Sequence, residues 1–356
     1  MNHRWFSKFL FVLTALIASM GCGTKCNPQW YDSLVYKNAC DDPDPYYIYV
    51  ASGFPLATGT GLVTKWTKQG TFLQVVYDYS KISSTVMPQG MTTHTINGIK
   101  RLVLLGFDGT NGRVDSINFD GTDFIPFFTN TGLAGGTKRI ASTASGGYLT
   151  TRTAAVEFFN SSNLRIGLPM FATAGTCTIS SGSGATEAVI NGTNYVVTSN
   201  AVVTPNNKLN LHNGSTGACI AGAVPAGPAT TMWPVNIKYV PDEGKLFALY
   251  YPFTGATTAA QIWRFDVSAT AISNGELIYT DTGAEIASTS ATPAALSSSI
   301  TYYKSLTERF ILVGTSNNSV IKLSYDGNTL TKVGTTPLVY LSGYSRSVSD
   351  VMVHIK

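Results

Sequence analysis

Charged side chains are scarce in this sequence. Asp, Glu, Lys and Arg make up 12% of its 356 residues, about half of the quarter that is usual in soluble domains. The formal net charge is +4, and loss of an N-terminal segment that carries Arg4 and Lys8 would leave +2. Because nucleic-acid binding depends on neutralising phosphates, we expect no nucleic-acid partner.

The sequence signatures of the commonest enzyme classes are also missing. There is no G-x-S-x-G elbow, H-E-x-x-H motif, Walker A loop or G-x-G-x-x-G fingerprint. The only similar stretch, "SGSG" at 181–184, is a turn-rich connector without a strand before it and a helix after it. We therefore expect no cofactor, and the sequence favours a binding protein over an enzyme.

Long hydrophobic runs are absent apart from twelve residues, 9–20. This run is shorter than the ~20 residues of a membrane-spanning helix. Arg4 and Lys8 precede it and Gly21 follows it, which is the pattern of a secretory signal peptide over residues 1–21. A retained anchor helix is the alternative.

The residues that follow, "SMGC" at 19–22, resemble the lipobox of bacterial lipoproteins, although Ser19 stands where that family prefers Leu. The resemblance implies that Cys22 is acylated, becomes the new N-terminus and anchors the protein to the cell envelope. Gly23, rather than Asp, after this cysteine resembles the class bound to the outer membrane. Cleavage without lipid, which would leave Cys22 as a free thiol, is the alternative.

Cysteine is rare and its count is odd, at five. Setting Cys22 aside leaves four, which in an exported chain can form disulfides with three possible connectivities. We favour the local pairs Cys26–Cys40 and Cys177–Cys219. A zinc site is the competing interpretation, but no CxxC pair exists.

Residues 22–45 form a lead segment that ends in "DDPDP". Asp41, Asp42 and Asp44 could bind calcium, but the prolines between them favour an extended linker. The propeller domain described next is therefore expected to cover residues 46–356.

No amphipathic helix follows residue 45; short alternating strands are separated by Gly, Asn, Asp and Ser. A strand that ends in an aromatic or His residue and a polar turn recurs six times. The recurring residues, 40 to 60 positions apart, are Trp66, Phe119, Phe159, His212, Phe265 and Tyr325. A second apolar strand precedes each of them, and a third leading strand precedes five of these units.

The first unit lacks its leading strand, whereas a lone strand, Ser349–Lys356, ends the chain. Exchange of this kind is typical of a β-propeller, in which strands from both termini complete one blade. We predict an all-β fold, a six-bladed β-propeller of four-stranded blades. The spacing is similar to that of NHL and TolB-like propellers; two β-sandwiches are the alternative.

In a propeller the leading strand of each blade lines the central channel, so polar residues on these strands are candidates for ligand binding. They are His94, Arg139, Glu187, Lys238, Tyr302 and Asp350. Each could instead be a buried polar residue satisfied by neighbouring groups. His94 and His354 are expected to be structural, and His212 to occupy a packing position that is aromatic in other units.

These features together predict a lipid-anchored envelope propeller that binds or scaffolds an envelope protein without catalysis. One alternative is a metal-dependent lactonase or hydrolase with His94, Glu187 and Asp350 as ligands. Another is a surface adhesin. The fold alone does not decide between them.

Overall fold

The computed structural model describes residues 46–54, 61–82, 86–96, 98–107, 112–129, 139–152, 155–162, 164, 176–177, 182–200, 208–223, 225–252, 259–286, 299–341 and 347–355. The predicted signal peptide, acylated Cys22, Cys26–Cys40 disulfide and linker lie outside the described residues. Tyr46–Lys356 forms one compact unit.

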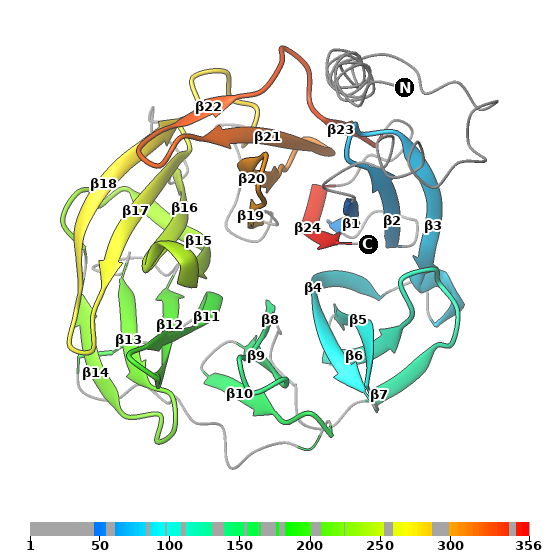
Figure 1. Cartoon of the computed structure of the whole chain (residues 1–356), viewed down its shortest axis with the longest axis horizontal. Helices are drawn as coiled ribbons and strands as arrows, with labels where there is room; N and C mark the ends of the chain where they lie inside the picture. Colours follow the sequence, from blue (N-terminus) through cyan, green and yellow to red (C-terminus); the bar gives the residue numbers. More distant parts are fainter. Residues whose placement is uncertain are drawn as a thin grey trace, which may run out of the picture. The chain divides into compact units, whose positions relative to one another are not determined.

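Six antiparallel sheets in this unit stand around a central axis as the blades of a propeller (Figure 1). The first blade joins β24 (Ser347–Ile355), β1 (Tyr46–Phe54), β2 (Leu62–Thr67) and β3 (Phe72–Asp78). The second contains β4 (Met87–Ile96), β5 (Ile99–Phe107), β6 (Gly112–Ile117) and β7 (Ile125–Thr129). The described part of the third contains β8 (Ile140–Ser142), β9 (Tyr148–Arg152) and β10 (Ala155–Phe159).

The fourth blade contains β11 (Gly182–Ile190), β12 (Thr193–Asn200), β13 (Leu209–Asn213) and β14 (Cys219–Ala223). The fifth contains β15 (Met232–Val240), β16 (Lys245–Pro252), β17 (Gln261–Val267) and β18 (Ile272–Thr280). The sixth contains β19 (Ile300–Lys304), β20 (Arg309–Gly314), β21 (Ser319–Tyr325) and β22 (Leu330–Lys332), and β23 (Val339–Tyr340) also pairs with β21. Two short 3-10 helices, Tyr79–Lys81 and Pro241–Glu243, follow β3 and β15.

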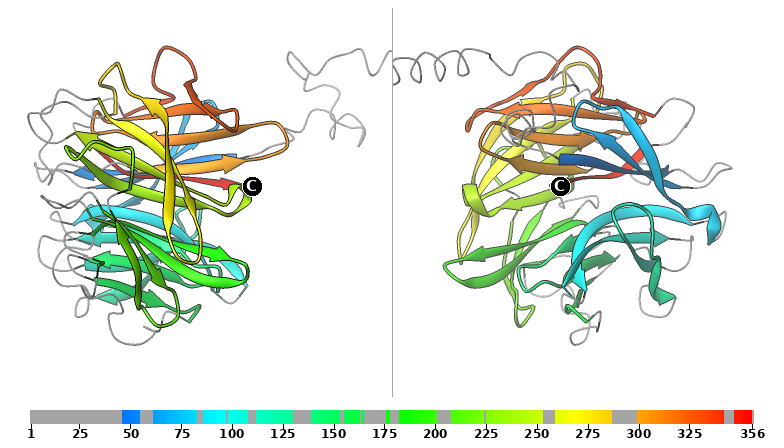
Figure 2. Two further views of the ribbon diagram at one scale, coloured as in Figure 1. Left: turned by 90° about the vertical axis from the view of Figure 1, so that its left-hand side faces the viewer. Right: turned by 45° about the vertical axis from the view of Figure 1, so that its right-hand side comes forward.

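The ring is closed by strands from opposite ends of the unit, as the sequence predicts. β24 lies antiparallel to β1, and the pairing runs from Tyr46 opposite Ile355 to Phe54 opposite Ser347. This pairing supplies the innermost strand of the first blade and covers an edge of β1 that would otherwise be open. Figure 2 shows the ring from the side, with strands running between its two faces.

Each blade is packed between two others, and the sequence of its middle strands reflects this. Residues 102–105 of β5 and 246–251 of β16 are fully buried without interruption, because both faces of these strands contact another sheet. The described residues form six hydrophobic clusters, and each lies between two consecutive blades. The chain therefore has a core of six separate interfaces around the axis.

The recurring residues of the sequence repeat lie where the pattern predicts. Trp66, Phe159, His212, Phe265 and Tyr325 are buried in or at the end of the third strand of their blades. Phe119 differs slightly, since it lies in the turn after β6 and is partly buried. Burial of these side chains explains why apolar or aromatic residues recur at this point of each unit.

The turn after β6 shows how the polar residues of the repeat work. Gly121 has φ +86°, and a Cβ there would lie 2.7 Å from the Val76 carbonyl oxygen of the first blade. An Asp-Gly pair suits this left-handed conformation. The Asp120 side chain accepts a 2.9 Å hydrogen bond from the Thr122 backbone N–H, which holds the turn.

One predicted disulfide is confirmed. Cys177 is bonded to Cys219, with Cα atoms 5.8 Å apart, and joins the segment before the fourth blade to its outermost strand β14. Cys177 is fully buried. The bond therefore holds the edge strand of the fourth blade, which pairs with only one other described strand of its sheet.

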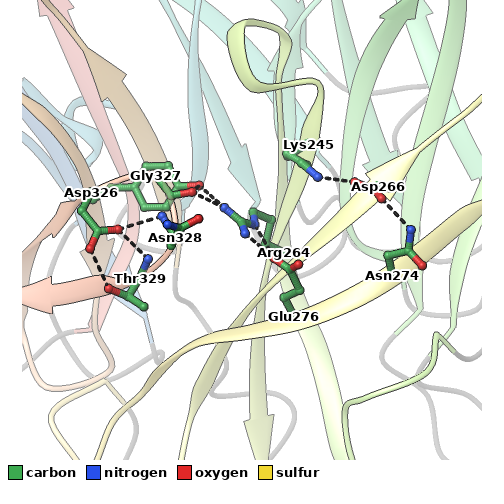
Figure 3. A network of polar contacts seen from close by, with 10 residues as sticks. Lys245, Arg264, Asp266, Asn274, Glu276, Asp326, Gly327, Asn328 and Thr329 are labelled. Atoms are coloured by element: carbon green, nitrogen blue, oxygen red, sulfur yellow. Dashed lines mark hydrogen bonds and ion pairs between the residues drawn. The ribbon is translucent and has the colours of Figure 1, made fainter.

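A polar network joins the outer parts of the fifth and sixth blades (Figure 3). Arg264 of β17 donates a 2.6 Å hydrogen bond from Nη1 to the Tyr325 hydroxyl and another to the Gly327 carbonyl. It also pairs with Glu276 of β18. The Asp326 side chain accepts hydrogen bonds of 2.7 Å from the N–H groups of Asn328 and Thr329, so the turn that presents Gly327 is itself held in place.

Candidate functional site

A cavity of about 220 Å³ lies where the six innermost strands meet. Its walls come from β4, β8, β11, β15, β19 and β24, together with Lys100 of β5. Four of the six predicted channel residues line it: Arg139, Lys238, Tyr302 and Asp350. We call this the axial cavity.

Asp350 is the only carboxylate among the residues that line the axial cavity. Its Oδ2 accepts a 2.6 Å hydrogen bond from the Met91 N–H, and its Oδ1 accepts one of 2.9 Å from the Val351 N–H. Burial raises the pKa of this carboxyl group, whereas Arg139 and the hydrogen bonds act to lower it. Asp350 thus ties β24 to β4.

Arg139 lies just before β8 and is 8% exposed. Its Nη1 donates hydrogen bonds to the carbonyls of Gln89, at 3.0 Å, and Ser349, at 3.3 Å. Burial lowers the pKa of the guanidinium, and Asp350 opposes this shift. The arginine links the third blade to the inner strands of the first and second blades.

Lys238 of β15 enters the axial cavity without such links. Among the described residues, no hydrogen bond or ion pair reaches its ammonium group. The side chain is partly exposed and lines the cavity. Burial lowers the pKa of Lys238, and the Asp350 charge only partly offsets this effect.

Tyr302 contributes to the wall of the cavity, but its hydroxyl group has a partner. It donates a 2.9 Å hydrogen bond to Glu243 Oε1 in the 3-10 helix after β15. Burial, followed by the proximity of Glu243, raises the pKa of this tyrosine. The residue joins the fifth and sixth blades.

His94 and Glu187 lie on inner strands but do not line the axial cavity. The His94 ring packs edge-on to Tyr148 with centroids 5.7 Å apart, and its Nε2 lies 2.9 Å from the Ser161 carbonyl oxygen. Glu187 accepts hydrogen bonds from the Ala144 N–H and, at 3.0 Å, from Asn194 Nδ2. Both residues therefore contact the third blade.

The predicted metal ligands His94, Glu187 and Asp350 are thus not brought together. More generally, within the part of the chain that the structure describes, no three His, Cys, Asp or Glu side chains are grouped so as to hold a metal ion. The described residues therefore do not fit the divalent cation of the lactonase alternative.

Several residues of the cavity wall were not singled out from the sequence. Lys100 lies on the second strand of its blade, whereas candidates from the sequence came only from the leading strand of each blade. Hydroxyl and amide side chains complete the polar wall: Thr92, Thr93, Ser142, Thr186, Asn236 and Thr301. Ser and Thr are so frequent in this chain that position on an inner strand was the only available signal.

Comparison with known proteins supports the fold and goes no further. No protein-family model matches the chain. No curated protein matches it at a significant level. The predicted relation to NHL and TolB-like propellers consequently stays a prediction.

Solved structures do resemble it. A chain of a nidogen/laminin complex has a TM-score of 0.57 at 10% identity, over 86% of this chain and 98% of that chain. A gluconolactonase from Xanthomonas campestris has a TM-score of 0.47 at 13% identity, over 83% and 86% of the two chains. An auxiliary nutrient binding protein from Bacteroides thetaiotaomicron has a TM-score of 0.47 at 11% identity, over 86% and 68%. At these identities the likeness is one of fold alone.

None of the helices in the described residues has the length and apolar character needed to cross a bilayer.

Proposed function

We propose that this protein is a lipid-anchored propeller of the cell envelope that binds a partner protein without catalysis. The observation that carries the proposal is an exposed apolar edge on the first blade. Phe72, Leu73 and Val75 of β3 are 49%, 45% and 43% exposed. Together they form what we call the β3 edge.

The β3 edge differs from the outermost strands of the other blades. In the described residues of those strands, Leu277 of β18 and Tyr340 of β23 are the large hydrophobic residues exposed to this degree, and they lie in different blades. Three such residues within four positions make a patch, whereas single exposed apolar residues are ordinary. A patch of this kind is typical of a protein-binding surface.

The position of β3 adds a second argument. It is the last strand of its sheet, so one side of its backbone has no neighbouring strand in that sheet. An open edge can accept an extended strand from another protein, with apolar pockets giving specificity. The Trp66 ring packs edge-on to Phe72, with centroids 5.2 Å apart, which holds the edge in a fixed form at little ordering cost.

The test is capture of complexes from gently solubilised envelopes at native expression, after cross-linking. The wild-type chain should be recovered in a complex, and Leu73→Lys should reduce that complex at least fivefold. Leu277→Lys, which places the same charge on an exposed leucine of β18, is the matched control and should behave as wild type. Recovery of the wild-type chain only as a monomer would reject the proposal.

The lipid anchor rests on the N-terminal sequence and needs its own test. The intact mass of the wild-type chain should include a diacylglycerol-sized increment, and Cys22→Ala should lack it while keeping both disulfides. An unmodified wild-type thiol at Cys22 would remove the anchor and leave the partner-binding proposal standing. The enzymatic alternative is tested by elemental analysis: a stoichiometric divalent metal in the purified protein would favour it.

A further inference from the structure

We infer that the axial cavity binds a small oxyanion, with the Lys238 ammonium group as its principal charged contact. The inference concerns the centre of the ring and does not depend on partner binding at the β3 edge. It rests on the charges in the cavity, on the hydrogen bonds that each charged group makes, and on the volume and polarity of the cavity.

The charges in the cavity wall are unequal. The lining residues include Arg139, Lys238 and the exposed Lys100, but only one carboxylate, Asp350. Both Asp350 oxygens already accept backbone hydrogen bonds, from Met91 and Val351. The guanidinium of Arg139 donates to two backbone carbonyls. The lining residues therefore carry more positive than negative charge, and Lys238, unlike Arg139, is a cation for which no hydrogen bond or ion pair is found among the described residues.

Lys238 is a cavity cation that lacks a direct partner among the described residues. Its ammonium group lies in a cavity where burial disfavours the charged form, and proteins normally pair such a charge. An anion in the cavity would supply the missing acceptor, and burial would strengthen the attraction relative to bulk water.

The remaining wall is suited to an oxygen-rich ligand. Thr93, Ser142 and Thr301 add hydroxyl groups, each of which can donate and accept hydrogen bonds. The volume of about 220 Å³ falls below the roughly 300–1,000 Å³ of pockets for drug-sized ligands. A phosphate ion or a small carboxylate has the right charge, size and hydrogen-bonding capacity.

Irregular strand pairing also occurs beside the axial cavity in three of the inner strands. Pairing is interrupted at Pro88/Gly90 in β4, at Gly182/Gly184 in β11 and at Pro234/Asn236 in β15. Each irregularity lies just before the residues of that strand that line the cavity. Bulges of this type redirect side chains and are frequent next to binding sites.

The experiment is calorimetric titration of the full-length, detergent-solubilised protein at constant ionic strength. Inorganic phosphate, acetate and citrate are the probes, so that phosphate and carboxylate ligands are distinguished. We expect saturable binding of at least one probe to the wild type and at least tenfold weaker binding to Lys238→Met. Lys245→Met, which removes a lysine paired with Asp266 outside the cavity, is the control and should bind as wild type does.

Loss of binding in Lys238→Met should not reflect unfolding. Methionine fills similar space and removes the cost of burying a charge, so the variant is expected to melt at the same temperature as the wild type or higher. A wild-type protein that binds none of the probes, or equal binding by Lys238→Met, overturns the inference.

A measurement on the wild type covers the case in which the variant does not fold. With isotopically labelled lysine, NMR can follow the titration of Lys238 directly. A bound anion stabilises the ammonium form, so the binding probe should raise the pKa of Lys238 and leave the NMR signals of Lys245 in place. A Lys238 titration that is unaffected by every probe also overturns the inference.

Discussion

The carboxylate of Asp350 accepts a 2.6 Å hydrogen bond from the backbone N–H of Met91, a residue 259 positions earlier in the chain. The bond joins the C-terminal strand β24, which closes the ring, to the inner strand of the second blade. Because Asp350 also accepts from Val351 at 2.9 Å through its other oxygen, each oxygen satisfies a different N–H group. Substitutions that remove one or both oxygens of Asp350 can therefore measure what its hydrogen bonds contribute to stability.

Asp350→Ala should destabilise the protein by about 1–3 kcal/mol, since it leaves the buried Met91 N–H without its acceptor. The Val351 N–H keeps a 2.8 Å hydrogen bond to the Ser299 hydroxyl. Asp350→Asn keeps one acceptor oxygen and should cost about half as much. Urea denaturation at pH 7 measures both changes. Asp242→Asn, at an exposed position of the Pro241–Glu243 helix, is the control and should change stability by less than about 0.5 kcal/mol. Equal effects of Asn and Ala would contradict this account.

Removal of the Cys177–Cys219 disulfide should lower stability substantially. The bond closes a loop across a sequence separation of 42, for which the chain-entropy model gives about 4 kcal/mol. The double variant Cys177→Ala, Cys219→Ala should therefore unfold at a clearly lower urea concentration than the oxidised wild type.

Reduction provides the control for this prediction. A reducing agent should bring the wild type close to the double variant and leave the variant itself unchanged. If the oxidised wild type and the double variant had the same midpoint, the disulfide would contribute nothing to the stability of the fourth blade.

The Arg264 network between the fifth and sixth blades should depend on Tyr325 more than on Glu276. Glu276 is 54% exposed, and exposed ion pairs contribute at most about 1 kcal/mol. The bonds from Arg264 to Tyr325 and Gly327 are less exposed and cross between blades. We expect Arg264→Met to cost about 1.5–3 kcal/mol and Glu276→Gln to cost less than about 1 kcal/mol.

A double-mutant cycle isolates the contact between blades. Arg264→Met and Tyr325→Phe share one hydrogen bond, so their effects on the free energy of unfolding should be less than additive. Arg264→Met and Asp242→Asn share no contact and should be additive. Strict additivity in the first pair would show that the hydrogen bond between Arg264 and Tyr325 contributes no coupling energy.

The architecture could be predicted because its signals are local. Apolar runs such as residues 102–105 mark strands buried on both faces, and Asp120–Gly121 marks a turn that needs positive φ. Ring closure followed from one missing strand at the start and one surplus strand at the end. These signals do not depend on knowing how one blade packs on the next.

The composition of the axial cavity could be predicted only in part, for a physical reason. The cavity is lined by three successive residues of each of β4, β11 and β15. His94 and Glu187 come directly after the last of these residues on their strands, whereas Lys238 is one of the three on β15. The sequence pattern predicts which strand lies innermost, but not how far along that strand the cavity extends.

His212 should make the protein sensitive to acid. It is 1% exposed, and burial lowers its pKa to about 4 from the ordinary 6.5. Between these two values the unfolded chain binds a proton that the folded chain does not, so stability falls as the pH decreases through this window. The loss attributable to His212 should reach about 2.5 kcal/mol at pH 4.5.

His212→Phe tests this directly, because aromatic residues occupy the equivalent position in other blades. The Thr198 hydroxyl, which lies 3.2 Å from His212 Nε2, keeps a 3.1 Å hydrogen bond from Asn210 Nδ2. The free energy of unfolding at pH 7 should therefore change by less than about 1 kcal/mol. As the pH falls to 4.5, the variant should become more stable relative to the wild type. Because burial also lowers the pKa of His354 to about 4, both proteins should retain some acid sensitivity. Denaturation curves that remain parallel from pH 7 to 4.5 would mean that His212 does not titrate in this range.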